Sequence, residues 1–200
     1  PDMRIGVPAE TRPHERRVAL VPDGVAKLTK AGCTVIVQRG AGTGAYLPDA
    51  DFEAAGATLV GSAAEAFAAD LVLKVQRPTA EEAALLREGA ALVSFLAPAA
   101  SADLLGALAG RKVTAFAMEL VPRTTKAQSM DALSSQATIA GYKAVLVGAD
   151  AMGRILPMLT TAAGTLAPAK VFVIGAGVAG LQAIATARRL GGIVSAFDVR

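Results

Sequence analysis

The sequence predicts an α/β fold in which parallel sheets are covered by helices. Short apolar runs rich in β-branched residues alternate with helical patterns along the 200 residues. Strands that are joined through helices pair in parallel, and both faces of such a sheet are covered. Near residue 175 a glycine-rich turn joins a further strand to an alanine-rich helix, which indicates a second unit of the same class.

The first part of the chain contains most of the alternating elements. We expect strands at 4–7, 34–38, 58–61, 71–75, 91–96 and 113–118, separated by helices at 23–31, 48–56, 62–68, 79–87 and 101–108. Gly32 and Gly56 stop two of these helices, whereas Ser62 and Ser101 are expected to cap two others. A polar loop at 119–131 follows the last of these strands.

A long helix rich in small residues follows the polar loop, from about Leu133 to Leu156. Its slim surface comes from small side chains, at Ala137, Ala140, Gly141, Ala144, Gly148, Ala149, Ala151 and Gly153. Glycine destabilises a helix relative to alanine, so several glycines indicate the close approach of another backbone. We therefore expect a first domain at 1–132, an interdomain helix at 133–158 and the beginning of a second domain at 159–200.

The run from Lys170 to Asp198 carries the most informative motif of the chain. An apolar strand leads through Gly-x-Gly-x-x-Gly into a helix, and a second strand ends at Asp198. In this pattern Gly175 permits a tight turn, Gly177 lets a pyrophosphate approach the backbone, and Gly180 lets the helix pack closely on the strand. The spacing is typical of a Rossmann-type dinucleotide site, and a tight turn without a ligand is the alternative.

The same motif indicates which dinucleotide would bind. Val178 and Ala179 begin the helix, so their backbone N–H groups and the positive end of the helix dipole face the phosphates. Asp198 lies 18 residues beyond Gly180, where a carboxylate accepts hydrogen bonds from the adenosine ribose and repels a 2′-phosphate. NAD(H) is therefore favoured over NADP(H), and Arg200 is a candidate to flank the adenosine.

The second Rossmann-like domain is expected to be truncated in this chain. A mononucleotide-binding half consists of three strands joined through two helices, whereas the sequence stops at Arg200 after the second strand. The later strands that would wall the adenine and ribose pocket are missing from it. We therefore expect weak NAD binding by the 200-residue chain.

Composition argues against several classes of function. The formal net charge is +3 and the positive side chains are scattered without a basic stripe, which argues against nucleic-acid binding. The single Cys33 excludes an internal disulfide and a cysteine-rich metal site, and it fits a reducing compartment. No signal peptide and no run of eighteen uncharged apolar residues is found, so we expect a soluble cytoplasmic chain without a metal.

Several segments together resemble one family. Residues 8–20, 38–45 and 74–78 are similar to segments shared by alanine dehydrogenases and the NAD(H)-binding component (domain I of the alpha subunit) of proton-translocating NAD(P) transhydrogenase. Two further segments resemble the transhydrogenase branch. They are 117–136, which holds an Arg–Gln–Asp loop, and the stretch from Met158 into the helix after the glycine turn. The resemblance covers nearly the whole chain and implies two Rossmann-like domains with doubly wound parallel sheets.

One position separates the two branches. Alanine dehydrogenases carry a catalytic histidine where this chain has Ala97, since deamination of an amino acid moves protons as well as a hydride. His14 lies in a charged loop, where a solvated side chain is the simpler interpretation. Hydride exchange between two nicotinamide rings needs no acid–base group at the reacting carbons. Arg17 and Lys74 match residues that hold the substrate carboxylate in alanine dehydrogenases, and here we expect structural ion pairs or hydrogen bonds.

The resemblance also implies the site residues. In the family, Arg123, Gln128 and Asp131 contact the cofactor near the nicotinamide, which makes them the candidates for the catalytic positions. Alternatives stay open for two of them, because Asp131 also suits an N-cap and Arg123 also suits a surface cation. Further candidate contacts to the cofactor are Ser129, Met130 and Ser134, although the Ser134 hydroxyl can equally bond within its helix.

The activity that the resemblance implies is hydride transfer from NADH to NADP⁺. The NADP(H) would be held by a separate partner domain, and a membrane-spanning component would couple the exchange to proton translocation. The family further implies a homodimer on the cytoplasmic side, peripheral to the inner membrane. The alternatives are an alanine-dehydrogenase-like, NAD-dependent oxidoreductase and a non-catalytic NAD-binding module.

Overall fold

The computed structural model describes residues 3–199 and divides into two compact units. The first unit extends to Val121 and the second begins at Pro122. Both contain parallel strands joined through helices, as the predicted fold class requires. The loop after Pro122 lies with the second unit, whereas the predicted domain limits place it in the first domain. Those limits, at 132 and 158, remain a prediction about function rather than compactness.

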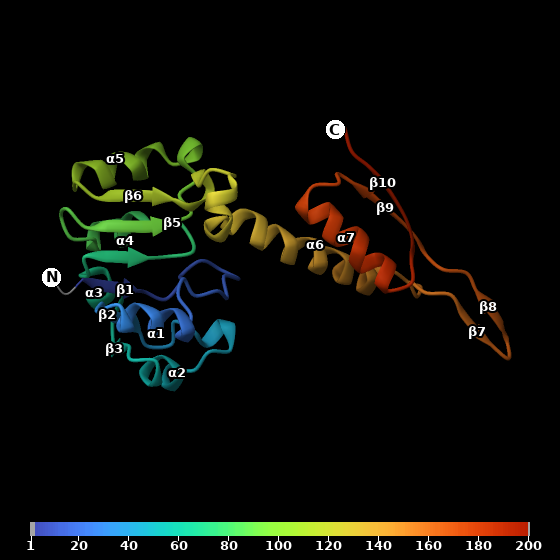
Figure 1. Ribbon diagram of the computed structural model, residues 1–200, viewed down its shortest axis with the longest axis horizontal. Coiled ribbons are helices and arrows are strands. Elements are labelled where there is room, and N and C mark those ends of the chain that lie inside the picture. The colour runs from blue at the N-terminus through green and yellow to red at the C-terminus, as the bar shows by residue number, and fades with distance from the viewer. Residues whose placement is uncertain (1–2, 200) are drawn as a thin grey trace. The chain divides into compact units, whose positions relative to one another are not determined.

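The first unit is built on a parallel sheet with the strand order β3–β2–β1–β4–β5–β6 (Figure 1). Its strands are β1 (Arg4–Val7), β2 (Thr34–Gln38), β3 (Thr58–Val60), β4 (Leu71–Leu73), β5 (Ala91–Ser94) and β6 (Thr114–Ala117). Ile5 of the central β1 pairs with Val35 on one side and with Leu71 on the other. This is the strand order of the Rossmann fold, in which the direction of winding reverses between β1 and β4.

Helices cover both faces of this sheet. The helices α1 (Pro22–Lys30) and α2 (Asp49–Ala54) pack together, and so do α3 (Ala63–Phe67), α4 (Ala80–Leu85) and α5 (Ala102–Gly110). The reversal of the winding direction explains the two groups. Right-handed crossovers that run in opposite directions place their helices on opposite faces of a sheet.

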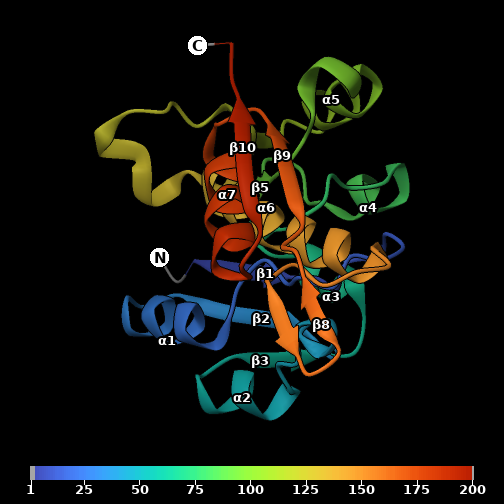
Figure 2. The same ribbon diagram turned by 90° about the vertical axis from the view of Figure 1, so that its right-hand side faces the viewer.

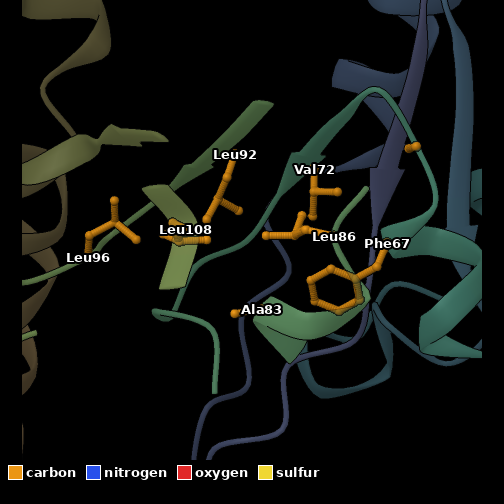
Figure 3. Packing of buried hydrophobic residues seen from close by; sticks show 8 residues of the cluster. Phe67, Val72, Ala83, Leu86, Leu92, Leu96 and Leu108 are labelled. Carbon is orange, nitrogen blue, oxygen red and sulfur yellow. The ribbon is translucent and has the colours of Figure 1, made fainter. Parts of the chain in front are cut away.

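Each face of the sheet has its own buried core. Figure 3 shows the core beneath α3, α4 and α5, which consists of Phe67, Val72, Ala83, Leu86, Leu92, Leu96 and Leu108 together with Ala69. The core beneath α1 and α2 contains Val35 and Val37, which are alternate residues of β2 and therefore point to the same face. Burying one such large side chain contributes about 1.5–3 kcal/mol.

Two predicted helix starts have different capping chemistry in the structure. Ser62 begins α3 with a capping box, in which its hydroxyl accepts from the Glu65 N–H and the Glu65 carboxylate accepts from the Ser62 N–H. Ser101 lies at the N-cap of α5 as predicted, but its side chain makes no capping bond. The Ser101 hydroxyl instead accepts a hydrogen bond of 2.7 Å from Arg77, so a long-range partner has replaced the local one.

In the second unit two helices pack against each other beside a pair of parallel strands. The helix α6 (Ala132–Ala151) lies against α7 (Val178–Arg189), and β9 (Lys170–Ile174) pairs with β10 (Ile193–Phe197). Figure 2 shows β9 and β10 side by side, with α7 next to them. Both strands have the predicted limits, and Asp198 directly follows β10.

Three features of the second unit and the loop before it differ from the prediction. The helix α6 ends at Ala151 rather than near Leu156, because the ring of Pro157 would collide with the Gly153 carbonyl if the helix continued. An antiparallel hairpin of β7 (Leu159–Thr161) and β8 (Gly164–Leu166) follows, and its short exposed strands had no sequence signal. The polar loop contains 3-10 helices at Met118–Leu120 and Thr125–Met130.

Candidate functional site

The glycine turn of the second unit has the backbone geometry that its motif predicts. Gly175 follows β9 with a φ of 95°, in the left-handed region where a side chain would be strained. Gly180 packs on the turn itself, since a Cβ atom at Gly180 would lie 2.7 Å from the carbonyl carbon of Gly175. These two glycines therefore bring the start of α7 directly onto the end of β9.

The third glycine of the motif faces open space. A Cβ atom built on Gly177 would meet no atom within 4 Å, so its absence is not required by packing. Gly177 is the N-cap residue of α7 and its position leaves the first N–H groups of the helix, including those of Val178 and Ala179, without intrahelical partners. An open backbone surface next to unpaired N–H groups fits a bound pyrophosphate.

The acidic residue at the end of the second strand reaches this turn. The Asp198 carboxylate accepts a hydrogen bond of 2.6 Å from the Ala176 N–H. The side chain is partly buried, and it lies where β9 and β10 end side by side. The carboxyl ends of neighbouring parallel strands are the usual position for an acid that binds a ribose in this fold.

A pocket of about 320 Å³ lies next to the glycine turn. It brings residues from the start of α6 and from the preceding loop together with the turn. The lining residues are Arg123, Leu133, Ser134, Ala137, Ile174, Gly175, Gly177, Val178, Ala179 and Gly180. Predicted residues from two separate parts of the sequence, Arg123 and Ser134 on one side and the glycine motif on the other, therefore share one site within the second unit.

The remaining predicted residues of the Arg–Gln–Asp loop lie outside the described lining of this pocket. Gln128, Ser129 and Met130 belong to the 3-10 helix and are exposed, whereas Ala127 is buried and anchors the segment. The structure thus places the loop residues at the surface of the unit. Their predicted contacts with a cofactor stay a prediction, and Arg200 lies outside the described residues.

Asp131 is the N-cap residue of α6. Its carboxylate accepts from the Ser134 N–H at 2.9 Å and from the Ser134 hydroxyl at 2.7 Å. The hydrogen bond from the Ser134 backbone, followed by the one from its hydroxyl and by the nearby Arg123 charge, lowers the pKa of Asp131 below its ordinary value. The cap that the sequence left as an alternative is therefore present, and it also holds the Ser134 side chain.

The first unit contains a buried ion cluster where β1 and β4 end. The Lys74 ammonium lies 3.3 Å from a Glu10 oxygen and 3.2 Å from a Glu82 oxygen, and its side chain is 1% exposed. The Glu10 carboxylate also accepts from the backbone N–H groups of Val75 and Gln76. Lys74 thus forms the structural ion pairs expected from the sequence.

Arg17 forms a second ion pair near this cluster. Its guanidinium binds the Glu15 carboxylate at 2.7 Å, and Gln76 donates a further hydrogen bond to the same carboxylate. The hydrogen bond from Arg17, opposed by burial and assisted by Gln76, lowers the pKa of Glu15 from 4.5 to about 2. Glu15 therefore stays ionised, and Arg17 already has an internal carboxylate partner.

The position that separates the two branches has an unusual backbone. Ala97 follows β5 with a φ of 48°, in the left-handed region, and its side chain is exposed. The Glu119 carboxylate accepts hydrogen bonds from the N–H groups of Leu96 and Ala97 and so holds this conformation. His14 is exposed, as expected for a solvated loop residue.

Sequence reasoning missed three lining residues of the pocket. Ala137 lies one turn beyond Ser134 on α6, so the helical period would have found it once Ser134 was chosen. Leu133 and Ile174 are apolar residues at the ends of their elements, and the sequence holds no signal that distinguishes them from packing residues. Between residues 3 and 199, no group of His, Cys, Asp and Glu side chains is arranged to hold a metal ion.

Fold and site together define an α/β protein of the Rossmann type with a dinucleotide-binding turn. The family models of alanine dehydrogenase/PNT match this chain, the N-terminal domain at residues 6–140 and the C-terminal domain at residues 144–200. The chain belongs to this family, which confirms the resemblance seen in the sequence. None of the helices described here has the length and apolar character needed to cross a membrane.

Similar proteins come from both branches of the family. The NAD(P) transhydrogenase subunit alpha of Rhodospirillum rubrum, in the first of its parts, is 54% identical, over 99% of this chain and 53% of its own length. Alanine dehydrogenase of Mycobacterium tuberculosis is 42% identical, over 98% of this chain and 54% of its own length. The solved transhydrogenase structure from Sinorhizobium meliloti has a TM-score of 0.95 at 52% identity, covering 98% of this chain and 57% of that one. The chain spans about half the length of these relatives.

Proposed function

We propose that this chain is the NAD(H)-binding part of a proton-translocating NAD(P) transhydrogenase, within its alpha subunit. The observation that carries the proposal is the pocket in which Arg123 and Ser134 meet the glycine turn. The relatives named as transhydrogenase subunits, at 54% and 49% identity, support the same assignment. When bound, NADH supplies a hydride, and we propose that NADP⁺ on a partner domain accepts it.

The residues of the pocket have distinct roles in this proposal. The N–H groups of Val178 and Ala179 bind the pyrophosphate, and Asp198 binds the adenosine ribose. Arg123 offers a planar fork of donors to phosphate or carboxamide oxygens. Ser134 also lines the pocket, and its hydroxyl is oriented by Asp131. Together these groups position a dinucleotide, which is the contribution that direct hydride transfer requires of the protein.

The loop residues would complete the nicotinamide end of the site. Gln128 both donates and accepts hydrogen bonds, so it suits a carboxamide, and Asp131 suits a ribose hydroxyl. Ser129 and Met130 are exposed on the same 3-10 helix and would cover the ring from the side of the loop. We propose these contacts from the family resemblance and from the position of the loop directly before α6.

Ala97 argues against the amino-acid dehydrogenase of the same family. A methyl side chain there provides no acid–base group, and the Glu119 carboxylate is already bonded to the backbone of the same turn. Lys74 and Arg17, the expected carboxylate-binding pair, are likewise bonded to internal carboxylates. These contacts favour the transhydrogenase branch over deamination of an amino acid.

The partners of the proposed function follow from the same family. We propose that the chain works as a homodimer with an NADP(H)-binding subunit or domain and with a membrane-spanning component. It would lie on the cytoplasmic side, peripheral to the inner membrane through these partners. A non-catalytic NAD-binding module is the alternative that a hydride-transfer assay distinguishes.

The test is a hydride-transfer assay with the full-length protein and an NADP-binding partner, in which NADH-dependent reduction is followed. Arg123→Ala is expected to lower the rate about tenfold or more, because a charge-assisted hydrogen bond to the dinucleotide is lost. Asp131→Asn is the sharper variant. Asn caps helices as well as Asp, so α6 stays intact while the carboxylate is removed.

We expect Asp131→Asn to unfold at the wild-type temperature and to transfer hydride more slowly. Normal turnover in both variants would remove the loop from the mechanism. NADH binding without any hydride transfer in the wild-type protein would make the chain a binding module. Formation of NADH from alanine by the same protein would instead support the dehydrogenase.

A further inference from the structure

A glycine in the middle of α6 allows this helix to touch the first turn of α7. Gly141 is buried, and a Cβ atom built on it would overlap the carbonyl oxygen of Ala179. The same Cβ would lie 2.9 Å from the Ala179 carbonyl carbon and 3.1 Å from its Cα. Real Cβ atoms do not approach backbone atoms so closely, so either helix would have to move if any side chain were present.

The contact is made at the part of α7 that lines the pocket. Ala179 and its neighbours Val178 and Gly180 form the first turn of α7, whose free N–H groups face the proposed pyrophosphate site. Ser134 and Ala137 line the same pocket from α6, and they share one face of that helix with Gly141 through the spacing i, i+3 and i+7. The face that lines the pocket is therefore also the face that seats α7.

We infer that Gly141 is a positioning residue for the dinucleotide. Its missing side chain sets the distance between α6 and the N-terminus of α7, and this distance decides where the N–H groups of α7 lie relative to Ser134. The inference rests on the proposed function, since it assigns a structural determinant to that same phosphate site. Gly141 itself touches no ligand in this arrangement.

The same helix offers a matched control. Gly148 is exposed on α6, and a Cβ atom there would meet no atom within 4 Å. Alanine at either position improves the intrinsic helix propensity by a similar amount. The variants Gly141→Ala and Gly148→Ala therefore differ in the contact with Ala179 and not in the chemistry of the substitution.

The experiment measures the dissociation constants of NADH, ADP and adenosine for the full-length protein and both variants by calorimetry. We expect Gly141→Ala to weaken NADH and ADP by about tenfold, because the charge-assisted hydrogen bonds to the phosphates lose their geometry. Adenosine lacks phosphates, so its affinity is expected to stay at the wild-type value. Gly148→Ala is expected to bind all three ligands as the wild type does.

The split between ADP and adenosine distinguishes positioning from a general structural role. Wild-type ADP affinity in Gly141→Ala, or an equal loss for ADP and adenosine, would overturn the inference. Circular dichroism accompanies each titration, and a Gly141→Ala protein that does not fold would also overturn it, by making Gly141 a requirement for folding. Failure of the proposed function would be visible separately, as a wild-type protein that binds neither NADH nor ADP.

Discussion

At the scale of single residues, the buried ammonium of Lys74 shows how the structure treats charge. Two carboxylates, from Glu10 and Glu82, neutralise it in a position that water does not reach. Burying such a group is unfavourable unless every donor and acceptor has a partner. Thr11 and the backbone of Val75 and Gln76 supply the remaining partners of the two carboxylates.

Lys74→Met is therefore expected to destabilise the protein by about 3–5 kcal/mol, because it leaves two carboxylates buried without their cation. The matched control is Lys112→Met. Lys112 pairs with Glu88 at 2.6 Å, but both side chains are largely exposed, and such a pair contributes about 0–1 kcal/mol. Urea unfolding of the two variants measures the difference, and an equally small effect of both substitutions would contradict the buried cluster.

Asp131 shows that one side chain can satisfy two interpretations. The sequence left a choice between an N-cap and a cofactor contact, and the structure contains the cap. The carboxylate is bonded to Ser134, which lines the pocket, so the cap also orients a candidate ligand-binding hydroxyl. A local hydrogen bond and a functional role are compatible here because both act on the first turn of α6.

At the scale of elements, the two glycines that follow Gly175 in the motif have different physical roles. Gly180 packs against the turn, whereas Gly177 faces open space. Gly177→Ala is therefore expected to cost less than about 1 kcal/mol of stability, as an alanine at an N-cap does. The same variant should lose about tenfold or more in ADP affinity, because a methyl group then occupies the side that the phosphates approach.

Gly180→Ala is expected to show the opposite pattern first, with a loss of about 1–3 kcal/mol from overpacking against the Gly175 carbonyl. Thermal unfolding and ADP titration of both variants provide the measurement. Equal thermal stability of the two variants, or full ADP affinity in Gly177→Ala, would show that the motif is a structural turn without a ligand.

The elements that could be predicted from the sequence are those whose signals are local. The strands β1, β2, β9 and β10 have the predicted limits, because each is an apolar run bounded by polar or glycine residues. Ser62 caps its helix through residues three positions away, which the sequence also displays. Ser101 does not, because Arg77, distant in sequence, has taken its hydroxyl.

The site could be predicted in the same uneven way. The spacing of Gly175, Gly177 and Gly180 identified the turn, whereas the loop residues came from the family resemblance alone. The contact between Gly141 and Ala179 joins two helices far apart in the chain, and small residues on α6 indicated close packing without indicating the partner. The hairpin of β7 and β8 had too few residues to show an alternating pattern.

At the scale of the whole molecule, binding of a dinucleotide should appear as stability. A ligand that binds the folded state at a hundred times its Kd raises the free energy of unfolding by about 2.7 kcal/mol. NADH is expected to raise the unfolding temperature of the full-length protein, and NADPH at the same concentration is expected to raise it less. The reason is Asp198, whose carboxylate would repel a 2′-phosphate at the edge of the turn.

Asp198→Asn should narrow the difference between the two dinucleotides. The variant keeps an acceptor for the Ala176 N–H while the negative charge is removed. Thermal scans with and without each ligand measure the effect. Equal stabilisation of the wild-type protein by NADH and NADPH would refute the role of Asp198 in selecting the cofactor.

The hydrogen bond between Asp198 and the Ala176 N–H has a further consequence for recognition. It ties the end of β10 to the turn after β9 while the protein is free of ligand. Part of the conformational entropy that an adenosine-binding loop usually loses on association has therefore already been lost during folding. The arriving nucleotide meets a rigid receptor, so its affinity depends on fit rather than on the ordering of a mobile segment.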